Sequence, residues 1–191
     1  GGKDRTVAVN RFGSFFDEAQ SFQGEITNRG GKTAALIHQV NRDSAPIAVD
    51  VVNVGNSTFD HLEAIEGVIV HALNGGAKSG FESYDGWNYA TDKSGKYRLR
   101  NKRTEWWWKF MEALDPDFGE GLMLPPDPEL LKELCSVRYK TIGGLLALEE
   151  KKDVIKRIGV SPDKAEAYIY AHADVSEPEV PYIPSGIIIT S

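Results

Sequence analysis

The sequence lacks most of the features that mark secreted, membrane-spanning or ATP-hydrolysing proteins. Cys135 is the only cysteine in 191 residues, which excludes a disulfide framework and a cysteine-based zinc site. We expect a buried, inert thiol and a reducing compartment. No run of eighteen apolar residues and no signal-peptide pattern occurs, so no membrane or secretory role is indicated. Gly31-Lys32-Thr33 lacks the upstream glycine of a phosphate-binding loop, and the histidines have no metal-ligand spacing.

Acidic residues outnumber basic ones, and the formal net charge of −6 opposes nonspecific binding to nucleic acid. The basic residues are unevenly distributed, however, because they crowd between Lys93 and Lys109. This stripe either follows a phosphate backbone or forms a solvated hairpin arm. The candidate DNA-binding residues in it are Arg98, Arg100, Lys102 and Arg103.

The first candidate site residue, Asp50, interrupts an apolar, β-branched run from Ile47 to Val54. Such a run is typical of a strand covered by helices on both faces. A carboxylate inside it is costly unless the group is paired, hydrogen-bonded or bound to a metal. Asp50 is therefore either a strand-end residue bonded to a neighbouring loop or part of a functional site. A helix running to about Glu66 follows.

A second pair of carboxylates, Asp163 and Glu166, lies in the first turn of a predicted helix. Ser161 has the residue type of an N-cap, and Pro162 that of a first helical residue. Backbone N–H groups and the helix dipole favour an anion at this end. An acidic residue that only complements the helix start gives the same pattern. The presence of Asp50 elsewhere favours the functional interpretation.

Together these segments resemble the nuclease domain of the large terminase subunit of tailed bacteriophages. In that family an apolar strand with a central Asp, followed by Asp-x-Leu, carries the second catalytic carboxylate, and Ser-Pro-Asp-x-Ala-Asp-Ala opens the helix that carries the third. Asp50 and Asp163 occupy those positions, and Glu166 replaces the second Asp of the helix. Further motifs follow in the family's order, so that the likeness covers about residues 1–173. They are Tyr97–Trp108, Leu124–Leu130, Arg138–Lys140 and Leu148–Asp153.

The resemblance implies an α/β fold of the RNase H-like class, with a mixed central sheet flanked by helices and a β-hairpin excursion. The nuclease domain would span residues 1–174 and a proline-containing tail 175–191. The implied activity is metal-dependent endonucleolytic cutting of concatemeric double-stranded viral DNA during genome packaging into procapsids. Asp50 and Asp163 would hold two Mg²⁺ or Mn²⁺ ions, and Glu166 would assist catalysis.

The same resemblance implies a location in the host bacterial cytoplasm. The implied partners are double-stranded DNA, a terminase ATPase domain, a small terminase subunit and the capsid portal. Residues 1–9 resemble the end of the family's first motif, whose catalytic Asp lies on a strand upstream of this point. We therefore predict that the polypeptide continues before Gly1 and that its extra strand brings a further Asp next to Asp50. The alternatives are another RNase H-like nuclease, such as a junction resolvase, or a non-catalytic DNA-binding or portal-docking module.

Periodicity and turn residues predict the remaining elements. Three consecutive tryptophans, Trp106 to Trp108, either pack in the core or stack on bases, and their spread around a helix favours the core. The predicted strands cover 5–12, 14–19, 47–54 and 68–73, and a hairpin covers 137–148 around Gly143-Gly144. The predicted helices cover 32–42, 104–114 and 151–158, with a short helix starting at Asp127.

Overall fold

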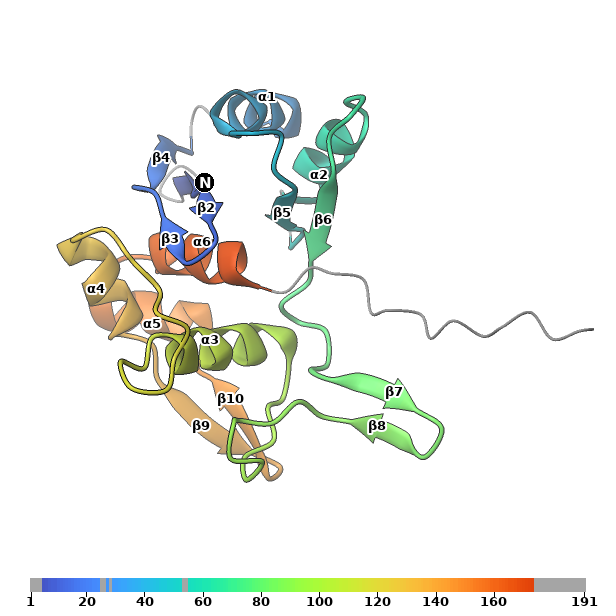
Figure 1. The fold of residues 1–191 in the computed structure, drawn as a ribbon, viewed down its shortest axis with the longest axis vertical. Coiled ribbons are helices and arrows are strands. Elements are labelled where there is room, and N and C mark those ends of the chain that lie inside the picture. The colour runs from blue at the N-terminus through green and yellow to red at the C-terminus, as the bar shows by residue number, and fades with distance from the viewer. Residues whose placement is uncertain (1–4, 25–26, 28, 53–54, 174–191) are drawn as a thin grey trace, which may run out of the picture.

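A computed structural model describes residues 5–24, 27, 29–52 and 55–173 (Figure 1). The predicted tail over 175–191 lies outside these residues. The helices are α1 (Gly30–Val40), α2 (Gly55–Glu63), α3 (Lys102–Ala113), α4 (Pro128–Leu134), α5 (Lys151–Ile158) and α6 (Asp163–His172). The strands are β1 (Arg5–Ala8), β2 (Arg11–Phe12), β3 (Phe15–Phe16), β4 (Gln20–Gln23), β5 (Ile47–Asp50), β6 (Val70–Leu73), β7 (Phe81–Ser83), β8 (Gly86–Asn88), β9 (Tyr139–Ile142) and β10 (Leu145–Leu148).

The described strands pair two by two. β5 and β6 run parallel, with Asp50 opposite Leu73, whereas β1 and β4 run antiparallel, with Arg5 opposite Gln23. Both pairing directions of the predicted mixed sheet are therefore present. The described strands do not join into one continuous central sheet, because β1 and β5 flank a groove instead of pairing with each other.

Successive side chains of β5 pack into two different hydrophobic cores. Ile47 and Val49 are buried and pack with Ala34 of α1 and Leu62 of α2. Ala48 lies on the opposite face, against the core built around α6. Because successive side chains of a strand point to opposite faces, Asp50 shares the face of Ala48. The register of β5 thus directs the Asp50 carboxylate toward α6.

The larger core lies between α3, α4 and α6. Trp106 and Trp107 are each only 8% exposed, which confirms the core-packing interpretation for these two residues. Trp108 is half-buried and packs edge-on against Tyr139 of β9, with ring centroids 5.5 Å apart. Phe110 completes the buried face of α3.

Two hairpins project from this body (Figure 1). β7 and β8 form the hairpin between β6 and α3. β9 and β10 form the predicted hairpin, with Gly143 and Gly144 at positive φ values of 57° and 77°. Two consecutive residues with positive φ are what a tight hairpin turn of this hand requires, so the glycine pair explains the turn.

Local predictions succeed at several helix ends and fail elsewhere. α5 covers the predicted residues, and the Asp127 side chain caps α4 by accepting hydrogen bonds from the N–H groups of Glu129 (2.8 Å) and Leu130 (3.2 Å). The predicted strand to Val54 is wrong, because β5 ends at Asp50. The expected burial of Cys135 is also wrong: α4 buries Leu130 and Glu133, and the exposed thiol follows its last turn.

No helix in the described ranges is long and apolar enough to cross a membrane.

Candidate active site

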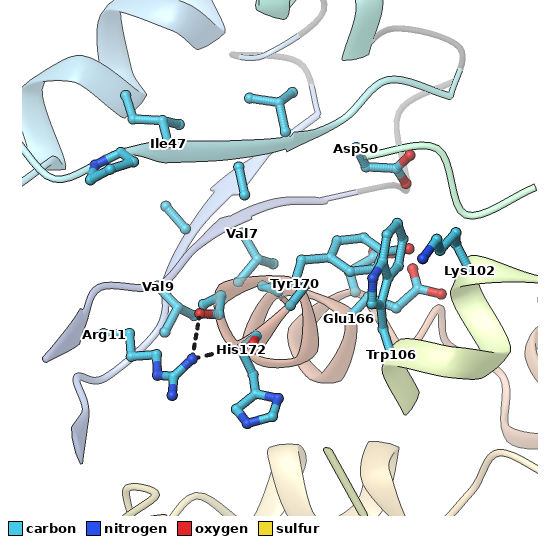
Figure 2. Close-up of a pocket in the computed structure, with 18 of the residues that line it drawn as sticks. Val7, Val9, Arg11, Ile47, Asp50, Lys102, Trp106, Glu166, Tyr170 and His172 are labelled. Atoms are coloured by element: carbon cyan, nitrogen blue, oxygen red, sulfur yellow. Dashed lines mark hydrogen bonds between the residues drawn. The ribbon is translucent and has the colours of Figure 1, made fainter. Parts of the chain in front are cut away.

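A groove of about 1490 Å³ runs between β1 and β5. The two strands form its walls, and residues of α1, α3 and α6 also line it. Apolar side chains such as Val7, Val9 and Ile47 line most of its length, while Asp50, Glu166 and Lys102 gather at one end (Figure 2). The groove therefore combines an apolar stretch between the strands with a charged cluster at one end, and further polar side chains such as Arg11 and His172 also line it.

Asp50 ends β5 and is held there by a local hydrogen bond. The Val52 backbone N–H donates to Asp50 Oδ1 over 3.0 Å, which turns the chain out of the strand. Burial raises the pKa of Asp50; the Val52 hydrogen bond opposes this rise, and the nearby Glu166 carboxylate adds to it. Asp50 therefore lies on the α6 side of β5, near Glu166, as the register of β5 requires.

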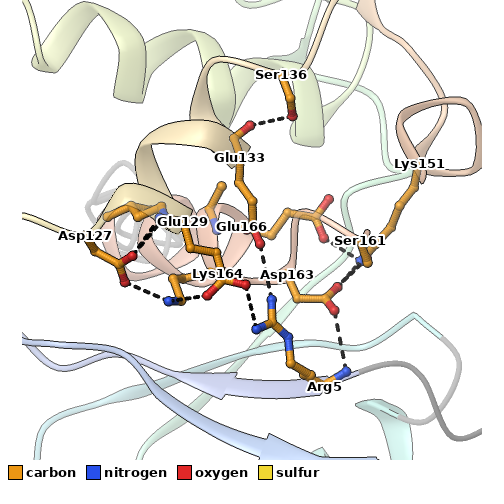
Figure 3. Close-up of polar contacts among 12 residues, drawn as sticks. Arg5, Asp127, Glu129, Glu133, Ser136, Lys151, Ser161, Asp163, Lys164 and Glu166 are labelled. Atoms are coloured by element: carbon orange, nitrogen blue, oxygen red, sulfur yellow. Dashed lines mark hydrogen bonds and ion pairs between the residues drawn. The ribbon is translucent and has the colours of Figure 1, made fainter. Parts of the chain in front are cut away.

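Asp163 and Glu166 are joined by one lysine from α5 (Figure 3). Lys151 Nζ lies 2.9 Å from Asp163 Oδ1 and 2.7 Å from Glu166 Oε2. Burial alone would lower the pKa of Lys151, but the charges and hydrogen bonds of these two carboxylates together outweigh it and raise the pKa. The lysine is therefore charged at neutral pH and places a cation between the two carboxylates.

Arg103 holds the other oxygen of Glu166. Its Nε donates to Glu166 Oε1 over 3.1 Å, and its Nη1 donates to the backbone carbonyl of Glu149 over 3.0 Å. The Arg103 and Glu166 side chains are 17% and 7% exposed. Glu166 is thus a buried carboxylate that is clamped between an arginine from α3 and a lysine from α5.

The start of α6 differs from its sequence prediction. Pro162 occupies the N-cap position and offers no side-chain acceptor, so the assignment of Ser161 as N-cap is wrong. The Ser161 hydroxyl instead donates to Asp163 Oδ1 over 2.5 Å. The serine therefore lies beside the carboxylate and orients it rather than capping the helix.

The four predicted DNA-binding residues fall into two groups. Arg98 and Arg100 are exposed on either side of buried Leu99. Their segment continues the β9–β10 hairpin, since Leu146 N–H donates to the Arg98 carbonyl and Arg100 N–H donates to the Leu146 carbonyl, each over 2.8 Å. Lys102 is ion-paired with Glu105 over 3.0 Å, and Arg103 is engaged with Glu166. DNA contact by all four residues stays a prediction.

Sequence reasoning missed two contributors to the cluster. Lys151 gave no signal beyond its place in a charged segment that starts a helix, and Arg103 stood out only as one of several basic residues. Their proximity to Asp163 and Glu166 arises from contacts between residues 12 to 63 positions apart in the chain. No spacing rule in the sequence relates such positions.

Comparison with solved structures identifies the fold of the chain. No family model and no curated protein matches the chain. Among solved structures, the nuclease domain of the large terminase subunit of bacterial virus Sf6 superposes with a TM-score of 0.63 at 22% identity, over 90% of this chain and 83% of that domain. The chain has the fold of a terminase nuclease domain.

Two further structures of variant forms of the Sf6 domain support the likeness over the same shares of both chains. One, determined with manganese and beta-thujaplicinol, has a TM-score of 0.64 and 19% identity. The other, determined with calcium, has a TM-score of 0.62 and 20% identity. The expected α/β class and the resemblance to the terminase nuclease fold are thereby confirmed.

Proposed function

We propose that this protein is a metal-dependent endonuclease that cuts concatemeric double-stranded viral DNA during genome packaging. The observation that supports this best is that Asp50, Asp163 and Glu166 all line the same groove, in a fold shared with a viral packaging nuclease. The proposed location is the host cytoplasm. A terminase ATPase domain, a small terminase subunit and the portal are the partners that this role would require.

The donor chemistry fits a hard divalent cation. Asp50 and Asp163 would hold Mg²⁺ or Mn²⁺, with Glu166 assisting, and all three offer carboxylate oxygens. Within the described ranges no three acidic, histidine or cysteine side chains are grouped closely enough to hold one ion together. Mg²⁺, however, commonly uses one or two protein carboxylates and keeps several waters. The Lys151 ammonium occupies one oxygen each of Asp163 and Glu166, so a metal ion would use their remaining oxygens or displace this ammonium.

Bound in a pair, such ions would activate a water molecule and stabilise the leaving oxygen of the phosphodiester. The protein residues orient the carboxylates for this role. Ser161 and Lys151 fix one oxygen of Asp163, and the Val52 N–H fixes one oxygen of Asp50. Arg103 and Lys151 hold Glu166 from two sides, so its release from one of these cations would accompany any direct role as a ligand.

The groove supports the proposal of an additional strand between β1 and β5. Adjacent strands lie about 4.8 Å apart, and α6 packs against both β1 and β5 although these strands do not pair. A strand between them would face apolar side chains of both groove walls, such as Val7 and Ile47. Its end would lie beside Asp50, where we propose the further catalytic Asp.

Nicking of supercoiled plasmid by the full-length protein with Mn²⁺ tests the proposal. Asp50→Asn and Asp163→Asn should each reduce cleavage by at least about a hundredfold, because a lost ligand removes charge stabilisation of the transition state. Glu166→Gln should have a milder effect. Asp153→Asn is the matched control, since Asp153 is exposed on α5 outside the groove.

Wild-type nicking by Asp163→Asn would refute the assignment of the site. Preferential cutting of a four-way junction over linear duplex would favour the resolvase alternative. DNA binding without cleavage under any divalent cation would favour the non-catalytic module.

A further inference from the structure

A second buried carboxylate, Glu133 of α4, lies directly behind the proposed site (Figure 3). Its side chain is 0% exposed. Glu133 Oε2 accepts a hydrogen bond from the Ala165 backbone N–H over 2.8 Å, and Oε1 accepts one from Arg5 Nη2 over 3.2 Å. Burial raises the pKa of Glu133, against the opposing effects of the Ala165 N–H and the Arg5 charge. A carboxylate buried in this way is costly unless both oxygens are satisfied, and here they are.

The contact with Ala165 supplies a cap that α6 does not have in its own sequence. The first N–H groups of any helix lack partners within the helix, and Pro162 provides no side-chain acceptor. Glu133 reaches this N–H from another helix and places negative charge at the positive end of the α6 dipole. The first turn of α6, which carries Asp163 and Glu166, is therefore fixed by α4.

Arg5 connects this cap to Asp163. Its guanidinium joins Glu129 Oε1 (2.8 Å) and Glu133 Oε1 (3.2 Å) on α4. Its backbone N–H faces Asp163 Oδ2 over 3.5 Å, at the outer limit of a hydrogen bond. One arginine of β1 thus contacts both the capping carboxylate and the proposed metal ligand.

We propose that Glu133, held by Arg5, is a positioning residue that fixes the first turn of α6 and thereby the carboxylates of Asp163 and Glu166. The capping contact is independent of the proposed function, whereas its consequence for metal binding rests on that function. Two measurements on the full-length protein separate the two parts.

The first measurement is amide hydrogen exchange at Ala165 by NMR. Glu133→Ala should accelerate exchange about tenfold or more, because a charge-assisted hydrogen bond is lost. The matched control is Lys132→Ala, since Lys132 lies on the same helix, α4, and its side chain is exposed. It should leave the Ala165 exchange rate within about twofold of wild type.

The second measurement is the Mn²⁺ concentration at half-maximal plasmid nicking. Glu133→Ala should raise this midpoint about 10-fold to 100-fold, as loss of a residue that orients metal ligands typically does. Saturating Mn²⁺ should largely restore the rate. Glu133→Gln should raise the midpoint only about threefold, because its amide oxygen can still cap Ala165 while the charge at the helix end is gone. This variant also carries the test if Glu133→Ala does not fold.

Faster exchange together with a raised Mn²⁺ midpoint would support the proposal. An unchanged exchange rate at Ala165 would overturn the capping contact. Faster exchange with an unchanged Mn²⁺ midpoint would overturn the positioning role and leave Glu133 a purely structural residue. If the wild-type protein cuts DNA without any divalent cation, the proposed metal-dependent function is wrong, and the positioning role of Glu133 is wrong with it. The exchange rate at Ala165 would still show whether Glu133 caps α6.

Discussion

Replacement of Arg103 by methionine tests whether this arginine serves the carboxylate cluster or the DNA. Methionine keeps the apolar stem beside Trp107, whose ring centroid lies 6.0 Å from the Arg103 guanidinium carbon. The change removes the donors to Glu166 Oε1 and to the Glu149 carbonyl. The change therefore removes the charge, its hydrogen bonds and the cation–π contact with Trp107, with little loss of packing.

The expected cost follows from how Glu166 is held. Removing one partner from a fully buried ion pair costs about 3–5 kcal/mol. Glu166 is 7% exposed, but it keeps its second partner, Lys151, whose side chain is 42% exposed. We therefore expect a loss of about 2 kcal/mol in the free energy of unfolding. For a chain of this size that corresponds to a fall of about 4–8 °C in the thermal midpoint.

Urea unfolding of four proteins measures the pairing directly: wild type, Arg103→Met, Glu166→Gln and the double variant. The double-mutant cycle should give a coupling energy of at least about 1 kcal/mol, because the two residues are in direct contact. Lys152→Met is the control for loss of a positive charge, since Lys152 pairs with Glu150 on the open surface. It should be indistinguishable from wild type.

The opposite pattern would refute this reasoning. It consists of a coupling energy near zero, together with a slope of log K against log salt for DNA binding that is about 0.9 smaller in Arg103→Met than in wild type. Arg103 would then contact phosphate, as its place in the basic stripe predicts, and its pairing with Glu166 would contribute nothing to stability.

Three further outcomes are expected. Arg98→Ala with Arg100→Ala should lower the slope of log K against log salt for duplex DNA by about 1.8 in fluorescence anisotropy; an unchanged slope would show a merely solvated arm. Burial would raise the pKa of Glu105, but hydrogen bonds from two lysines outweigh it and lower the pKa. Because the folded pKa then lies below the unfolded one, the stability that Glu105 contributes is present at neutral pH and lost as the pH falls through its folded pKa. Glu105→Gln should thus destabilise more at pH 7 than at pH 3 in urea unfolding, and equal losses would contradict this. Gly80→Ala should lower the thermal midpoint more than Gly95→Ala: both have positive φ, but only at Gly80 would a Cβ collide with β8.

The sequence by itself determined the local elements that carry the candidate site. The β-branched run predicted the strand that ends at Asp50, although not its end, because hydrophobicity continues past the point where the chain turns. The glycine pair at Gly143-Gly144 predicted the β9–β10 turn, and Asp127 predicted the start of α4. These signals are readable because each depends on residues within a few positions of one another.

Only the tertiary structure decided which charges meet. Lys151 joins Asp163 to Glu166, and Glu133 caps α6 from 32 positions away. These contacts depend on how α3, α4, α5 and α6 pack, which no local pattern encodes. The groove between β1 and β5 is likewise a tertiary feature, because the packing of α6 against both strands sets how far apart they lie. A carboxylate's neighbours, unlike its helix or strand, are a property of the folded chain.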